Sequence, residues 1–144
     1  VTPVSQMPSG EQPIETSHLE LLPSDKHQTQ KAAALVKLGY PEVAPVLAEI
    51  LVWMQDMNWP VARVFLPFLV RIGAPLAPHI RNVLSGDDDV WKYWILNSIV
   101  RESAALACEL KPELERLAKH PSFGEQREGV SEAAQQILDL PAEG

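Results

Sequence analysis

The chain of 144 residues contains an internal repeat, and this repeat limits its possible folds more than any other feature. Residues 35–41 (LVKLGYP) match residues 69–75 (LVRIGAP), 34 positions later. In both copies an apolar stretch ends at Gly-x-Pro, and a second stretch begins with VAP or LAP. Residues 99–101 (IVR) echo the same place a third time, without the Gly-x-Pro junction. A period in the thirties, with two helices in each unit, is typical of helical solenoids.

The apolar residues from Leu22 onward have a helical period, and no segment alternates like a strand. The clearest stripe predicts a helix with one buried face, and its members are Val43, Val46, Leu47, Ile50, Leu51 and Met54. We expect helices over residues 25–38, 41–55, 59–72, 75–84, 90–102, 104–110, 112–118 and 122–139. The predicted fold class is all-α, a solenoid of about three helix pairs plus a C-terminal capping helix.

Local signals set the expected helix ends. Gly39 and Gly73 each follow a last helical turn, where glycine is favoured. Pro41 and Pro75 are expected to open the next helices, because the missing N–H of proline costs little in a first turn. Asn58 is the predicted N-cap of helix 59–72.

Two further N-caps are expected nearer the chain ends. Ser24 or Asp25 can cap the first helix. Ser122 and Glu125 have the spacing of a capping box, in which each side chain bonds to the other residue's backbone N–H. The helix that they open has one apolar and one polar face, as the last helix of a stack requires.

Residues 1–21 differ in character from residues 22–144, which we expect to form a single domain. The first segment is rich in Pro, Ser and Gln, and carries Glu11, Glu15 and Glu20 without any Lys or Arg. This composition predicts a flexible acidic tail. It has neither the basic start nor the apolar run of a secretory signal, so the expected location is cytoplasmic.

Charge and cysteine content exclude several classes of function. The 12 basic and 19 acidic side chains give a net charge of -7, which argues against a protein that binds nucleic-acid phosphates along a basic stripe. The single cysteine, Cys108, excludes an internal disulfide framework and a cysteine-based zinc site. No apolar run approaches the roughly 18 residues of a membrane helix. We therefore expect no nucleic-acid partner, no membrane partner and no cofactor.

Three segments together resemble a known family. They are residues 22–27 (LPSDKH), 58–62 (NWPVA) and 87–94 (DDDVWKYW). They are similar to a bacterial family of small, functionally uncharacterised HEAT-like domains, over roughly residues 20 to 120. The resemblance implies an all-helical, HEAT-like right-handed stack. It implies no activity, so it assigns no catalytic residue.

The aspartates at 87–89 allow two interpretations. Three carboxylates could hold a hard cation. Capping of the helix that follows, with negative charge at its positive end, explains them better, because adjacent side chains at a helix start diverge.

The tryptophans also allow two interpretations. Trp53, Trp59, Trp91 and Trp94 can pack in the core, or some of them can anchor an interface, where aromatic residues with a polar rim are common. Trp59 and Trp91 begin helices in equivalent units, so we expect them on the same edge of the stack. Val52 and Trp53 lie off the buried stripe and mark an alternative face.

These patterns predict a protein-binding module without enzymatic activity, because a small solenoid presents an extended surface. The acidic balance favours a basic protein partner, and an immunity or inhibitor role against a basic toxin is one form of this function. The residues expected to contact the partner are Asp56, Asn58, Trp59, Asp87, Asp88, Trp91, Lys92 and Trp94.

Two alternatives make different structural predictions. A nucleic-acid-associated HEAT-like protein requires a basic groove. An unrecognised enzyme requires a deep polar cavity with a cluster of shifted pKa values. The sequence has none of the common nucleophile, dinucleotide, P-loop or metalloprotease motifs, and its four histidines are scattered, so we assign no catalytic residue.

Overall fold

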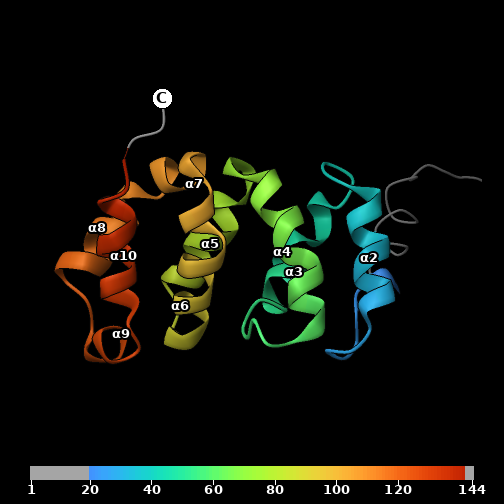
Figure 1. Ribbon diagram of the computed structural model, residues 1–144, viewed down its shortest axis with the longest axis horizontal. Coiled ribbons are helices and arrows are strands. Elements are labelled where there is room, and N and C mark those ends of the chain that lie inside the picture. Colours follow the sequence, from blue (N-terminus) through green and yellow to red (C-terminus); the bar gives the residue numbers. More distant parts are fainter. Residues whose placement is uncertain (1–19, 142–144) are drawn as a thin grey trace, which may run out of the picture.

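The computed structural model describes residues 20–141, and every regular element in this range is helical (Figure 1). The α-helices are α2 (Thr29–Leu38), α3 (Leu47–Val52), α4 (Pro60–Ile72), α5 (Ala77–Leu84), α6 (Asp89–Ser98), α7 (Ala104–Glu109), α8 (Lys111–Lys119), α9 (Phe123–Arg127) and α10 (Val130–Leu138). Three 3₁₀ turns join them, η1 (Ala44–Val46), η2 (Ala74–Leu76) and η3 (Val100–Glu102). The predicted all-α class is confirmed. The predicted tail lies outside the described residues, except for Glu20 and Leu21.

The helices stand side by side along the long axis, with α2 at one end and α8 and α10 at the other (Figure 1). Helix α2 packs against α4, α3 against α5, and α5 against α6. Helix α10 packs against both α6 and α8. Most of these contacts join helices that are one or two places apart in chain order, and α10 also returns to contact α6.

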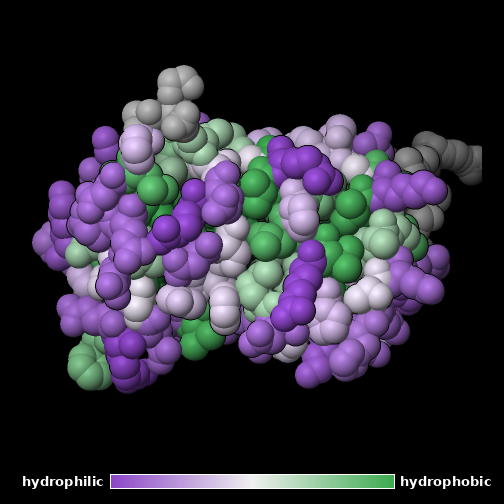
Figure 2. Space-filling model, viewed as in Figure 1, coloured by the Kyte–Doolittle hydropathy of each residue, from purple (hydrophilic) through white to green (hydrophobic). Residues whose placement is uncertain are grey.

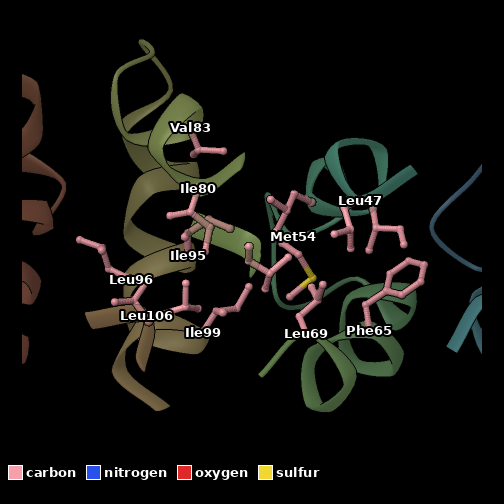
Figure 3. Packing of buried hydrophobic residues seen from close by; sticks show 14 of the residues in the cluster. Leu47, Met54, Phe65, Leu69, Ile80, Val83, Ile95, Leu96, Ile99 and Leu106 are labelled. Carbon is pink, nitrogen blue, oxygen red and sulfur yellow. The ribbon is translucent and has the colours of Figure 1, made fainter. Parts of the chain in front are cut away.

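The predicted stripe of residues 43–54 is confirmed as core, because all six of its members are buried. Met54 and Leu69 face Ile80 and Ile95 of the neighbouring helices (Figure 3). Phe65 of α4 is fully buried as well. One apolar cluster thus runs from α2 through to α10.

The second expected helix begins later than predicted. Pro41 lies in a turn, and the first helical turn is η1, which has Pro45 near its start. Proline fits the first turn of a helix, and both Pro41 and Pro45 satisfy this rule, so the sequence pattern alone does not distinguish them. The backbone N–H of Val43 donates to the carbonyl of Gly39, which closes the turn before η1.

The predicted cap at Asn58 is wrong. Its backbone N–H donates to the Asp56 carboxylate at 2.8 Å, so both residues belong to the loop. Trp59 is the N-cap residue of α4 and makes no side-chain cap hydrogen bond. Pro60 follows in the first turn, where a missing N–H needs no partner.

The first expected helix begins at Thr29, because Ser24 and Asp25 stabilise the preceding loop. The Ser24 N–H donates to the Gln28 side chain at 2.7 Å, and the His27 N–H donates to the Asp25 carboxylate at 2.8 Å. Contrary to the prediction, neither Ser24 nor Asp25 caps α2, whose N-cap residue is Gln28.

Two expected helices are interrupted. Helix 90–102 is α6 followed by η3. Helix 122–139 is α9 and α10, which Gly129 separates with a φ of 83°. A left-handed residue ends a helix, and glycine adopts this conformation without steric cost.

The burial of Leu51 generates a test of this core. Leu51 is fully buried in α3, whereas the adjacent Val52 is 42% exposed. Leu51→Ala should lower the free energy of unfolding by about 2–5 kcal/mol, because it leaves a cavity in the core. Urea denaturation measures this change. Val52→Ala is the matched control and should cost less than about 0.5 kcal/mol. Equal losses in the two variants would contradict the observed packing.

Candidate functional site

The start of α6 carries four of the eight residues that the sequence marks for binding: Asp87, Asp88, Trp91 and Lys92. Asp88 is the N-cap of α6, and its carboxylate accepts a hydrogen bond from the Trp91 N–H at 3.0 Å. Asp87 precedes it and is exposed. Residues 87–91 form a corner at the start of α6, and this corner separates two hollows, one apolar and one polar.

The apolar hollow lies between α3, α5 and Trp91 and has a volume of about 270 Å³. The indole N–H of Trp91 donates to the Leu51 carbonyl at 3.1 Å, which fixes the ring against α3. The hollow is lined by Ala48, Leu51, Val52, His79, Asn82, Val83 and Trp91. Trp91 is therefore partly core and partly the wall of an open apolar surface.

The polar cleft on the other side of the corner has a volume of about 420 Å³. It is lined by Leu84, Ser85, Gly86, Asp87, Asp89, Lys92, Arg116, Ser122 and Glu125. Among these, Lys92 and Glu125 are each only 3% exposed. Buried charges are costly unless they are paired, so the partners of these two residues decide what the cleft can do.

Glu125 is at the centre of an ion-pair network. Arg116 donates to both of its carboxylate oxygens, at 3.0 and 2.9 Å. The Nζ of Lys92 donates to Oε2 at 2.7 Å, and the Ser122 N–H donates to Oε1 at 2.8 Å. Lys92 also pairs with Asp89 at 2.9 Å. The network joins α6, α8 and α9.

The predicted capping box at the start of α9 is confirmed. The Ser122 hydroxyl accepts a hydrogen bond from the Glu125 N–H at 3.1 Å, and the Glu125 side chain returns the bond to Ser122. Glu125 thus serves both the local cap and the ion-pair network.

The network holds its members in their charged forms. Hydrogen bonds from Arg116 lower the pKa of Glu125 to about 2, against the opposing effect of burial, and Lys92 and the Ser122 N–H add to this shift. Burial of Lys92 opposes its charge, but hydrogen bonds to Glu125 and Asp89 outweigh it, so its pKa is raised. The hydrogen bond to Glu125 also raises the pKa of Arg116.

These shifts suit a structural network better than acid–base chemistry. A general acid or base works best with a pKa near the operating pH. The pKa of Glu125 is shifted further below pH 7, and the pKa of Lys92 is shifted further above it. A polar cleft, which the enzyme alternative requires, is present. The pKa shifts of Glu125, Lys92 and Arg116, however, keep these groups charged near neutral pH.

The aspartates at 87–89 have separate roles. Asp88 caps α6, and Asp89 pairs with Lys92. Asp89 also lies so close to Gly124 that a Cβ atom on this glycine would clash with the Asp89 carboxylate. Within residues 20–141, no three Asp, Glu, His or Cys side chains converge to hold a metal ion.

Lys92 does not belong to the exposed surface that the sequence predicts. Its side chain is buried in the ion-pair network at the wall of the polar cleft, so it adds almost nothing to the exposed surface. Glu125 and Arg116, which the sequence analysis did not select as site residues, complete this network.

The other predicted residues lie at or near the same end of the helices. The loop of residues 53–59, the start of α6 and α9 all lie at the lower edge in Figure 1. In this loop, Trp59 packs edge-on against Trp53, with ring centroids 5.7 Å apart. Trp94 is half-buried and packs edge-on against Tyr93 at 5.4 Å.

A hollow larger than these two, with a volume of about 520 Å³, lies elsewhere, between α7, α8 and α10. It is mainly apolar and includes the exposed Cys108. None of the residues selected from the sequence for binding lines it.

A family model described as a domain of unknown function (DUF5071) matches residues 21–138. The chain belongs to this family. No curated protein matches the chain. The match spans both hollows at the start of α6, so the candidate site lies within the family's own domain.

Among residues 20–141, no single helix is both long enough and apolar enough to cross a membrane. The pair Pro60–Ile72 and Ala74–Leu84 meets the length and composition criteria when taken together, but is bent by 110°.

The ion-pair network predicts a strong effect of Glu125→Gln. At pH 7 this change should lower the free energy of unfolding by about 3–5 kcal/mol, because Lys92 loses a charged partner in a buried position. Urea denaturation measures the loss. The control is Glu113→Gln, since Glu113 pairs with Arg81, whose side chain is 43% exposed, and it should cost about 1 kcal/mol or less.

The pH dependence gives a second measurement on the same variants. The Glu125 pKa is about 2 in the folded chain and 4.5 as the ordinary value. Its stabilising effect is therefore complete above the ordinary value and is lost as the pH falls toward 2. Between pH 6 and 2 the parent chain should lose more stability than Glu125→Gln. Parallel losses would contradict the network.

Proposed function

We propose that this chain is a non-enzymatic protein-binding module that holds a basic protein partner at the start of α6. In this proposal the helices form a HEAT-like, right-handed solenoid of about three helix pairs, closed by α10. The internal repeat and the packing of helices in chain order support this arrangement.

The observation that carries the proposal is the apolar hollow beside an acidic rim. Val52 is exposed at the hollow, and Trp91 is held there by its bond to Leu51. Asp87 and Asp88 are exposed at the adjacent corner. An aromatic wall with a charged rim is typical of binding hot spots.

Charge favours a basic partner. The chain carries a net charge of -7, and acidic surfaces speed the association of basic proteins. A toxin-neutralising immunity or inhibitor protein would use such a surface, and this is the specific role that we favour.

Site-directed photocrosslinking tests the proposal. A photoreactive phenylalanine analogue replaces Val52 in the full chain, which is expressed in the cells that naturally produce it. The matched control carries the analogue at Leu38, which is 40% exposed at the end of α2. We expect one discrete adduct with a basic protein from position 52 and none from position 38.

The crosslinked partner then permits a quantitative measurement. Val52→Ser should weaken its binding about tenfold, equivalent to about 1.4 kcal/mol, because an apolar contact is lost. Leu38→Ser should leave the dissociation constant unchanged. No adduct at position 52, or equal effects of the two substitutions, would overturn the proposal.

A further inference from the structure

Positive charge gathers on α4 and α5, although the whole chain carries a net charge of -7. Residues 57–86, which include both helices, contain Arg63, Arg71 and Arg81 and no Asp or Glu. Arg81 is paired with Glu113, with 2.8 Å between Nε and the carboxylate oxygen. The two arginines of α4 therefore need a separate explanation.

The exposed side of α4 carries Arg63, Pro67 and Arg71, which we call the arginine face. Arg63 donates to the Met57 carbonyl at 3.4 Å, and neither arginine forms an ion pair with any of residues 20–141. Figure 2 shows hydrophobic atoms beside strongly hydrophilic ones in the middle of the view, over α4. This face therefore offers two guanidinium groups with an apolar ring between them.

One segment of the same chain has the matching pattern. The arginine face repeats every four residues, a rise of about 6 Å per step along a helix. Residues 11, 13 and 15 are Glu, Pro and Glu. In an extended segment alternate residues share one face and lie about 6.6 Å apart, and Pro13 favours an extended backbone. An extended segment thus places a glutamate opposite each arginine and proline opposite proline.

Residues 11–15 are also within reach of the arginine face. The Val61 N–H at the start of α4 donates to the Lys26 carbonyl at 3.2 Å, so the chain just before α2 lies against α4. Helices α2 and α4 pack together, and packed helices lie about 8–10 Å apart. Residues 11–15 precede Glu20, the first described residue, by a stretch of chain that spans up to about 17–30 Å. This length is sufficient to cross α2 and lie along α4.

We propose that residues 11–15 dock on the arginine face of α4 in the same molecule. The two guanidinium groups donate to the carboxylates of Glu11 and Glu15, and Pro13 packs on Pro67. The docked segment shields the arginine face from acidic groups of other molecules, which must displace it to bind there. This inference is independent of the proposed function, because no residue of the arginine face lines either hollow at the start of α6.

The docked segment exchanges with a free form. The composition of residues 1–21 gives them little structure of their own, so contacts with α4 determine the position of the segment. Exposed ion pairs are individually weak and are screened by salt. The docked population therefore falls as the ionic strength rises.

Paramagnetic relaxation enhancement tests this contact in the full chain. The labelled protein carries Cys108→Ser and Gln12→Cys, with a nitroxide at position 12, which the extended geometry turns away from α4. At low salt we expect the amide signals of Leu66 and Val70 to lose intensity. The signal of Glu132 on α10, at the opposite end of the stack, should keep its intensity (Figure 1).

Two double variants separate specific docking from general attraction. Arg63→Gln with Arg71→Gln should lower the enhancement at Val70 about fivefold, because both exposed ion pairs are lost. Lys31→Gln with Lys37→Gln is the matched control, since it removes two exposed charges from α2, and it should leave the enhancement unchanged. These lysines are six positions apart and so lie on different sides of their helix. The spectrum of each variant without nitroxide shows that it is folded.

A charge exchange completes the test. Glu11→Arg and Glu15→Arg, combined with Arg63→Glu and Arg71→Glu, should restore the enhancement that either pair of changes removes. Equal losses in the arginine and lysine variants, or no recovery in the exchanged chain, would overturn the docking. Broadening of a nitroxide-free, isotope-labelled chain by added nitroxide-labelled chain would overturn it as well, because the contact would then join two molecules.

Discussion

The candidate site depends on the ion pairs that the Glu125 carboxylate forms with Arg116 and Lys92. It ties α9 to α8 through Arg116 and to α6 through Lys92, while it also completes the cap of its own helix. These bonds fix the first turn of α6, which contains Trp91 and directly follows Asp87 and Asp88. A buried pair contributes less to stability than it costs to break, so the position of this corner depends on every member of the network being present.

The sequence predicts the buried framework well, because local periodicity determines which face of a helix is apolar. The stripe from Val43 to Met54 is buried throughout, and Gly39 and Gly73 end their helices as expected. Boundaries are predicted less well where two local signals compete. Pro41 and Pro45 both suit a first turn, and the chain uses Pro45. Gly129 interrupts an apolar pattern that otherwise continues across it.

The site is predicted only in part, because its key contacts are distant in the sequence. A lysine at position 92 has the local pattern of an exposed residue, and its burial depends on Glu125, 33 residues away. The bond from the Trp91 indole to Leu51 spans 40 residues. Neither contact leaves a signal in one sequence, whereas the Ser122 capping box, which is local, was predicted correctly.

The three aspartates at the corner divide between residues that hold the fold and a residue that faces solvent on the proposed binding surface. Asp89 is engaged with Lys92 and Asp88 caps α6, so replacement of either residue disturbs the helix start. Asp87 makes no such bond and is exposed to solvent. Substitutions at Asp87 and Val52 can therefore alter the charge and shape of the surface while the ion-pair network holds the backbone beneath it. In the proposed function, such substitutions would change which partner the surface fits without a change of fold.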